Sequence, residues 1–226
     1  LCLICVICEY NTTLYNKTDY FQDYLDNNGV SLSDAIYVQK TPLTVSPFQD
    51  WIDFANNNEC VKKASLPRPY YQTENGGMQN SVLTFSLGYD EKNTIEHNYG
   101  NSETQNIELK RLFGIDNLYK LGLDPKTALL RLLIYYPGHG IPMHTDTFNS
   151  YKSYYNIPKN KDITIKRYFV AISPWDWGHM LQVHNNVLTH WQTGDTWNIP
   201  EMTYHLSVNY GIAPKYSLTL TGQENV

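Results

Sequence analysis

Two histidines and one aspartate are the residues of this sequence best suited to hold a metal ion. His144 and Asp146 are separated by one residue, and His205 follows later in the chain. On a β-strand, residues two apart point the same way, so the first pair can act together. Imidazole and carboxylate donors on one face of an ion suit Fe(II) and leave other coordination positions open. We therefore predict that these three residues bind one Fe(II) and form the catalytic centre.

A cation and a hydroxyl group follow the second histidine of this set. Lys215 comes ten residues after His205, and Ser217 comes two residues after Lys215. The sequence from 215 to 221 alternates in polarity, so Lys215 and Ser217 share one face of a predicted strand. An ammonium group pairs strongly with a carboxylate when water is excluded. The pair therefore predicts a site for a dicarboxylate co-substrate.

Three predicted strands position these side chains. Residues 128–136 form an apolar run that Pro137 and Gly138 close, so His144 and Asp146 lie just beyond a buried strand. Residues 203–208 alternate in polarity, with His205 and a serine on one face. The turn at 209–214 then predicts a hairpin that brings the strand from 215 to 221 to the same side as His205. Short strands and turns in quick succession after residue 166 are typical of a β-sandwich.

The arrangement resembles the Fe(II)- and 2-oxoglutarate-dependent oxygenase superfamily, whose fold is a double-stranded β-helix, also called a cupin-like jelly roll. The resemblance covers the chain from about residue 127 onward. In that superfamily a basic residue shortly after the distal histidine binds the far carboxylate of 2-oxoglutarate, commonly with a hydroxyl residue beside it. Lys215 and Ser217 match this description, and a lysine there is similar to the prolyl 4-hydroxylase branch. The resemblance predicts a mainly β fold with flanking helices.

A second branch shares other features with the chain. The stretch from Tyr136 to His144, and Arg167 at the start of an apolar strand, are similar to the aspartyl/asparaginyl β-hydroxylases. That branch lacks a metal-binding carboxylate, which Asp146 supplies here. The resemblance implies that Arg167 binds the near carboxylate of 2-oxoglutarate or contacts substrate, and a salt-bridged strand residue is the alternative. Tyr136 could reach the co-substrate from the first strand, unless it is a core residue.

The resemblance implies a dioxygenase that uses Fe(II), 2-oxoglutarate and O₂ to hydroxylate a protein side chain, an amino acid or another small substrate. A non-catalytic cupin-like module that binds a metal or a sugar is one alternative, but it gives no reason for Lys215 and Ser217. A zinc hydrolase is another, because Zn(II) also accepts histidine and carboxylate ligands. A hydrolase would need a general base near the metal, and the sequence contains no His-Glu motif of that kind.

Composition and charge limit the other classes. A chain of 226 residues is expected to form one domain, with residues 1–126 as a supporting region and 127–226 as the catalytic jelly-roll core. A net charge of −5 argues against general nucleic-acid binding. The basic residues Lys159, Lys161, Lys166 and Arg167 are the one notable cluster, and a solvated loop explains them. The apolar run at residues 1–8 is too short to span a bilayer. Three of the four cysteines lie in this run, so a reducing cytoplasm and no membrane association are expected.

The N-terminal half predicts supporting elements. Helices are expected at 19–28, 46–63 and 105–122, and a strand at 81–87. Among the other histidines, His184 and His190 are rival metal ligands, but ordinary packed or surface roles are favoured for both. His97 lies in a polar stretch from 91 to 104, which predicts a solvated side chain.

Overall fold

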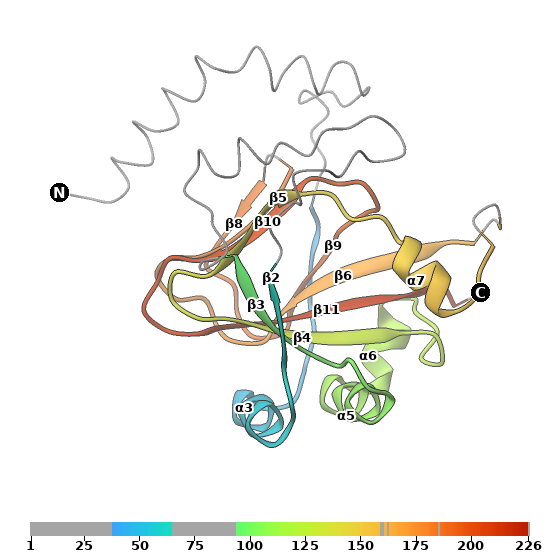
Figure 1. Ribbon diagram of the computed structural model, residues 1–226, viewed down its shortest axis with the longest axis horizontal. Helices are drawn as coiled ribbons and strands as arrows, with labels where there is room; N and C mark the ends of the chain where they lie inside the picture. The colour runs from blue at the N-terminus through green and yellow to red at the C-terminus, as the bar shows by residue number, and fades with distance from the viewer. Residues whose placement is uncertain (1–37, 65–93, 159–160, 162, 185, 226) are drawn as a thin grey trace, which may run out of the picture.

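Two antiparallel β-sheets face each other in the computed structural model of the protein (Figure 1). The structure describes residues 38–64, 94–158, 161, 163–184 and 186–225. The seven-stranded sheet contains, in spatial order, β1 (Lys40–Pro42), β9 (Asp195–Asn198), β6 (Ile165–Ala171), β11 (Lys215–Gln223), β4 (Leu129–Tyr135), β3 (Ile95–Tyr99) and β2 (Val61–Ala64). The four-stranded sheet contains β5 (Gly140–His144), β10 (His205–Asn209), β7 (His179–Val183) and β8 (Asn186–Leu188).

The chain passes repeatedly from one sheet to the other. Strands β4, β6, β9 and β11 belong to the large sheet, whereas β5, β7 and β10, which lie between them in sequence, belong to the small one. This alternation makes the fold a double-stranded β-helix, mainly β with flanking helices, as the sequence predicts. It also corrects one prediction, because β10 and β11 are not a paired hairpin. They lie in different sheets, and the turn between them, which contains Pro214, carries the chain from the small sheet to the large one.

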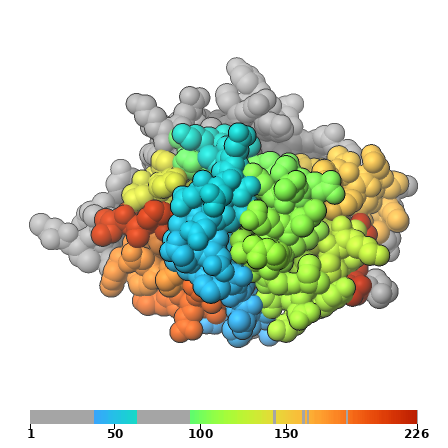
Figure 2. Space-filling view, turned by 90° about the horizontal axis from the view of Figure 1, so that it is seen from below, coloured from blue at the N-terminus to red at the C-terminus, as the bar shows by residue number. Residues whose placement is uncertain are grey.

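Helices cover the outer face of the large sheet. These are α3 (Phe48–Asn57), α5 (Glu103–Phe113) and α6 (Ile115–Lys120), and Figure 2 shows α3 and the α5–α6 region side by side over this face. Alternate residues of β4 and β11, including Leu132 and Leu218, point toward the helices and join one apolar cluster with Trp51 and Leu109. This layer is the larger hydrophobic core of the described residues.

The helices differ from their predicted lengths for clear local reasons. The single helix expected at 105–122 is divided at Gly114, whose φ of 88° ends α5 and begins α6. Ser102 starts α5 earlier than predicted, because its side chain accepts a hydrogen bond from the Gln105 amide. The helix expected at 46–63 stops at Asn57, and residues 61–64 form β2 instead. The elements expected at 19–28 and 81–87, and the N-terminal cysteines, lie outside the described residues.

Two connections complete the part of the fold that surrounds the site. The short helix α7 (Asn149–Tyr154) lies between β5 and β6, beside the end of the large sheet in Figure 1. The hairpin of β7 and β8 pairs Val183 with Asn186, so its turn begins at His184, which has a φ of 51°. No helix of the described residues has the length and apolar composition that a membrane span requires.

Candidate metal centre

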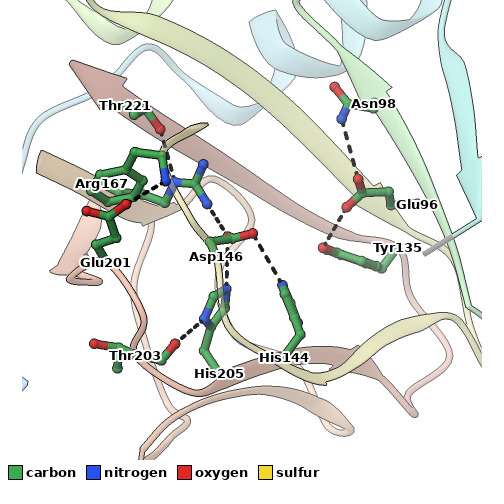
Figure 3. Close-up of polar contacts among 11 residues, drawn as sticks. Glu96, Asn98, Tyr135, His144, Asp146, Arg167, Glu201, Thr203, His205 and Thr221 are labelled. Atoms are coloured by element: carbon green, nitrogen blue, oxygen red, sulfur yellow. Dashed lines mark hydrogen bonds and ion pairs between the residues drawn. The ribbon is translucent and has the colours of Figure 1, made fainter. Parts of the chain in front are cut away.

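The three predicted metal ligands come together at one end of the small sheet. His144 ends β5, His205 begins β10, and the two residues are register partners across the strand pair. Asp146 follows β5 by two residues. One potential donor atom from each of the three side chains lies within 4.8 Å of the others, which is the spacing of a group able to hold a metal ion. Figure 3 shows the two imidazole rings and the carboxylate converging on one point.

The hydrogen bonds of His205 prepare it to bind a cation. Its Nδ1 lies 2.9 Å from the Thr203 carbonyl oxygen, and because a carbonyl only accepts, Nδ1 carries the proton. In the neutral ring, Nε2 then presents a lone pair, and it faces Asp146 Oδ2 at 3.4 Å. Two acceptors at this distance are stable together only with a positive charge on the ring or between them. The donor set therefore fits a metal cation.

Asp146 is held as a carboxylate by its surroundings. Burial by itself raises the pKa of Asp146, but its contact with the His205 ring and the charge of Arg167 outweigh that effect and hold the pKa well below its usual range. Arg167, on β6, forms an ion pair with Asp146 Oδ2. Its Nε also donates to Thr221 Oγ1 at 3.0 Å. Asp146 is therefore negative and available to a metal at neutral pH.

Lys215 lies between the sheets, and its ammonium group is completely buried. Its Nζ donates to the Met180 carbonyl at 2.7 Å and to Ser207 Oγ at 2.8 Å, and the Val208 carbonyl is 3.4 Å away. All three acceptors are neutral, and no carboxylate of the described residues forms an ion pair with this ammonium. Burial lowers the pKa of Lys215 well below its usual value. A buried cation without a compensating anion is costly, and an anionic ligand would relieve that cost.

Ser217 supplies a second polar group beside Lys215. Alternation along β11 puts both residues on the interior side, as predicted, and the Ser217 side chain is 0% exposed. Its Oγ has no hydrogen-bond partner among the described residues. Buried hydroxyl groups are normally satisfied, so an unpaired one in the interior marks a place for a missing ligand. The ammonium and the hydroxyl together suit a carboxylate.

Tyr136 does not reach this region, which corrects the prediction made for it. It follows the last residue of β4, is 39% exposed, and contacts the rings of His97 and His139 at centroid distances of 4.7 and 6.2 Å. Consecutive residues of an extended chain point to opposite sides, so the inward residue is Tyr135. Its ring centroid is 5.3 Å from Lys215 Nζ.

Two further polar residues of the interior, Tyr135 and Glu96, were not predicted from the sequence. The Tyr135 hydroxyl donates to Glu96 Oε2 at 3.2 Å, and Asn98 Nδ2 is 3.4 Å from Glu96 Oε1 (Figure 3). Burial, followed by the nearby Glu96, raises the pKa of Tyr135 well above its usual value. Both Glu96 and His97 lie in the polar stretch from 91 to 104, where the sequence predicts a solvated His97, but they belong to β3, an internal strand of the large sheet. The alternation of Ile95, His97 and Tyr99 on one side was the available signal.

The other predicted candidates lie elsewhere. His184 is buried in the turn after β7, and His190 is exposed and stacks on Trp175 at 4.1 Å, so neither joins the metal-binding group found among the described residues. Arg167 points inward, whereas Lys166 pairs with Glu224 at 2.5 Å, so these two do not form one basic patch. Lys166 and Arg167 therefore lie on opposite sides of β6, and Lys159 lies outside the described residues.

Comparisons with known proteins give fold similarity at low sequence identity. No protein-family model matches the chain, and no curated protein sequence matches it. A prolyl-4-hydroxylase from Pseudomonas putida is 13% identical, with a TM-score of 0.34, over 78% of this chain and 98% of that one. The non-heme α-ketoglutarate-dependent epimerase SnoN from nogalamycin biosynthesis is 10% identical, with a TM-score of 0.42, over 77% and 81%. A predicted oxalate decarboxylase from Thermotoga maritima is 10% identical, with a TM-score of 0.33, over 57% and 81%. These proteins differ in activity, so the likeness does not assign a reaction to this chain.

Proposed function

We propose that this protein is an Fe(II)- and 2-oxoglutarate-dependent dioxygenase that hydroxylates a protein side chain, an amino acid or another small substrate. One juxtaposition carries the proposal. A group of two histidines and one carboxylate stands at the end of the small sheet. The facing sheet carries a buried ammonium and a buried hydroxyl that have, among the described residues, no anion and no hydrogen-bond partner respectively. A metal-binding module alone would not need the second pair. We further propose that the whole chain forms one domain, because β1, β2 and β3 from its first half complete the same large sheet.

The residues that would bind the metal and those that would bind the co-substrate lie at two different places in the interior. His144, Asp146 and His205 would hold Fe(II), and the hydrogen bond from His205 Nδ1 to the Thr203 carbonyl would leave its Nε2 free to bind the ion. Lys215 would pair with the far carboxylate of 2-oxoglutarate, and Ser217 would donate to the same group. Fe(II) with 2-oxoglutarate and O₂ supplies the oxidising power for hydroxylation, while 2-oxoglutarate loses carbon dioxide and becomes succinate.

Aromatic side chains shield the proposed carboxylate site from water. The Lys215 ammonium lies 5.3, 5.6 and 5.4 Å from the ring centroids of Tyr135, Phe169 and Trp191. Their faces attract a cation, and their bulk excludes solvent, so a carboxylate that enters would meet the ammonium at low dielectric. These three aromatic rings would therefore strengthen the ion pair between Lys215 and the co-substrate.

Anaerobic titration with Fe(II) and 2-oxoglutarate tests the proposal directly. The superfamily resemblance predicts a weak visible absorption band toward the red only when metal and co-substrate bind together. Zn(II) in place of Fe(II) is the control and should give no band. Metal binding without the band at any 2-oxoglutarate concentration would favour the cupin-like binding module. Failure to bind any metal would contradict both readings.

Measuring succinate production in the presence of candidate substrates would identify the substrate class. With Fe(II), 2-oxoglutarate and O₂ present, succinate above the uncoupled background should appear when the correct pool is added. Peptides, free amino acids and nucleic acids are the pools to compare, and a response to the first or second is expected from the proposed substrate class. A response to nucleic acids alone would contradict that class while leaving the oxygenase chemistry intact.

A further inference from the structure

Arg167 occupies a position that the proposed chemistry does not yet explain. It was a candidate ligand for the near carboxylate of 2-oxoglutarate, but in the structure its guanidinium is bound to Asp146 (Figure 3). We propose that Arg167 is a positioning residue, which fixes the Asp146 carboxylate in the orientation that binds the metal, and that it does not bind the co-substrate. This inference rests on the proposed function in taking Asp146 as a metal ligand.

Asp146 needs such support because no strand holds it. His144 and His205 lie on paired strands and face each other in register, so the sheet sets the direction of both rings. Asp146 lies beyond β5, and its backbone carbonyl accepts a hydrogen bond from the Met202 amide at 3.0 Å. That bond fixes the main chain but leaves the side-chain torsions free. A contact to the carboxylate itself is required to restrict them.

Arg167 is anchored independently of Asp146. Its position on β6 pairs with Thr221 on β11, and Nε donates to Thr221 Oγ1 at 3.0 Å. Its guanidinium carbon lies 5.2 Å from the ring centroid of Phe148, whose amide donates to Glu201 Oε1 at 2.9 Å. The planar guanidinium is thus held from two sides before it reaches the carboxylate. A group fixed in this way can transfer the rigidity of the large sheet to Asp146.

The geometry also divides the two carboxylate oxygens. Oδ2 of Asp146 faces Arg167 and His205, and Oδ1 faces His144 at 4.0 Å. A carboxylate with one oxygen engaged by a guanidinium is less able to bind a metal through both oxygens. Restricting Asp146 in this way would preserve open positions for the co-substrate and O₂.

Charge and positioning predict opposite effects on metal affinity, which makes the inference testable. A guanidinium near a divalent cation repels it, so removing the charge alone should tighten metal binding. If Arg167 acts by orienting Asp146, removing it should weaken metal binding, by about 10–100-fold for the loss of a residue that supports a ligand. The sign of the change therefore separates the two roles.

The measurement is the affinity for Mn(II), by calorimetry without 2-oxoglutarate, on the full chain. Arg167→Met and Arg167→Lys are both expected to weaken Mn(II) binding. Lysine keeps the positive charge but lacks the planar guanidinium that can hold the carboxylate in one orientation. Thr221→Val, which removes one anchor, should weaken it by a smaller factor. At saturating Mn(II), the affinity of the Arg167 variants for 2-oxoglutarate should stay within about threefold of the native value. Arg131→Met is the control for loss of charge, because Arg131 faces the same interior side and interacts electrostatically with Arg167 but contacts Asn101 in place of Asp146, so its Mn(II) binding should not weaken.

Two results would overturn the inference. Unchanged or tighter Mn(II) binding in Arg167→Met would leave no positioning role, and if that variant did not fold, unchanged binding in Thr221→Val would count equally. A large loss of 2-oxoglutarate affinity at saturating Mn(II) would instead make Arg167 a co-substrate ligand. Failure of the proposed function has a different signature, because His205→Ala would then retain Mn(II). If His205→Ala loses the metal and Arg167→Met does not, only the positioning role is wrong.

Discussion

The two sides of the seven-stranded sheet are built from the same strands but have opposite character. Toward the helices, β4 and β11 present only aliphatic side chains over their central parts, including Leu130, Leu132, Leu218 and Leu220, all fully buried. Toward the small sheet, the intervening positions include Lys215 and Ser217. A strand such as β11 therefore contributes apolar side chains to the core on one side and polar side chains to the space between the sheets on the other.

This difference separates what stabilises the fold from what the site requires. Apolar burial against the helices lowers the free energy of the folded state. A buried ammonium without an anion and an unpaired hydroxyl raise it. Features that cost stability are expected to persist where a ligand uses them, which supports the proposal that the interior side carries the site.

The largest effect should come from the metal ligands at the edge of this interior. His205→Ala is expected to abolish Fe(II) binding and turnover, because the two remaining side chains hold iron poorly. His190→Ala, which removes an exposed histidine away from the site, should leave both intact. Metal content after anaerobic reconstitution and desalting gives the answer. The ligand assignment is wrong if the first variant keeps a full equivalent of iron and the second loses it.

On the helix-facing side, Leu132→Ala should destabilise the protein without changing the site. Leu132 is 0% exposed, and truncating a buried leucine typically costs about 2–5 kcal/mol. Urea unfolding measures the loss in the free energy of unfolding. The metal affinity of the folded fraction should match that of the native protein. A variant that kept full stability but lost metal would show that the two sides do not act separately.

Sequence periodicity was enough to predict much of this arrangement. The polar alternation of residues 215–221 predicted which side of β11 carries Lys215 and Ser217, and the His-x-Asp spacing beside an apolar strand predicted where two ligands meet. Both inferences depend on the two-residue period of a strand, which is a local property. The fold class followed from the same pattern combined with the superfamily resemblance.

The remaining features depend on contacts between distant segments. Tyr135 and Tyr136 are neighbouring residues of the same type, and the strand register decides which of them faces the interior. The contact of Arg167 with Asp146 joins a strand of the large sheet to a loop after the small one, so no local spacing could indicate it. The break at Gly114 was equally hidden, because a glycine within a helical pattern does not by itself end a helix.

Lys215 allows the interior side to be tested for ligand binding. Lys215→Ala should weaken 2-oxoglutarate binding by about 30-fold or more, because truncating one partner of a buried ion pair costs about 2 kcal/mol or more. Lys215→Arg should be milder, and metal affinity should stay near native in both variants. Calorimetry with 2-oxoglutarate on the Mn(II)-loaded protein provides the comparison. Unchanged affinity in Lys215→Ala would remove the main support for a co-substrate site and favour the binding-module alternative.

The smallest expected effect is a pH dependence of stability that only the interior side should show. Burial lowers the pKa of Lys215 in the folded protein, whereas in the unfolded chain a lysine titrates near its usual value of about 10.4. Between these two pKa values the unfolded chain binds more protons, so the free energy of unfolding rises with pH in that window. Below the lowered pKa, the folded protein carries the full cost of burying the charge.

Lys215→Met should remove this contribution in the ligand-free protein. The stability of Lys215→Met relative to the native protein should then be greatest at neutral pH or below and should shrink as the pH rises toward 10. Leu218→Met, at a helix-facing position of the same strand, adds or removes no titrating group, so its difference from native should be flat with pH. Urea unfolding at a series of pH values measures both differences. Parallel curves for the two variants would show that Lys215 carries no uncompensated charge, and the contrast between the two sides of the sheet would then need another explanation.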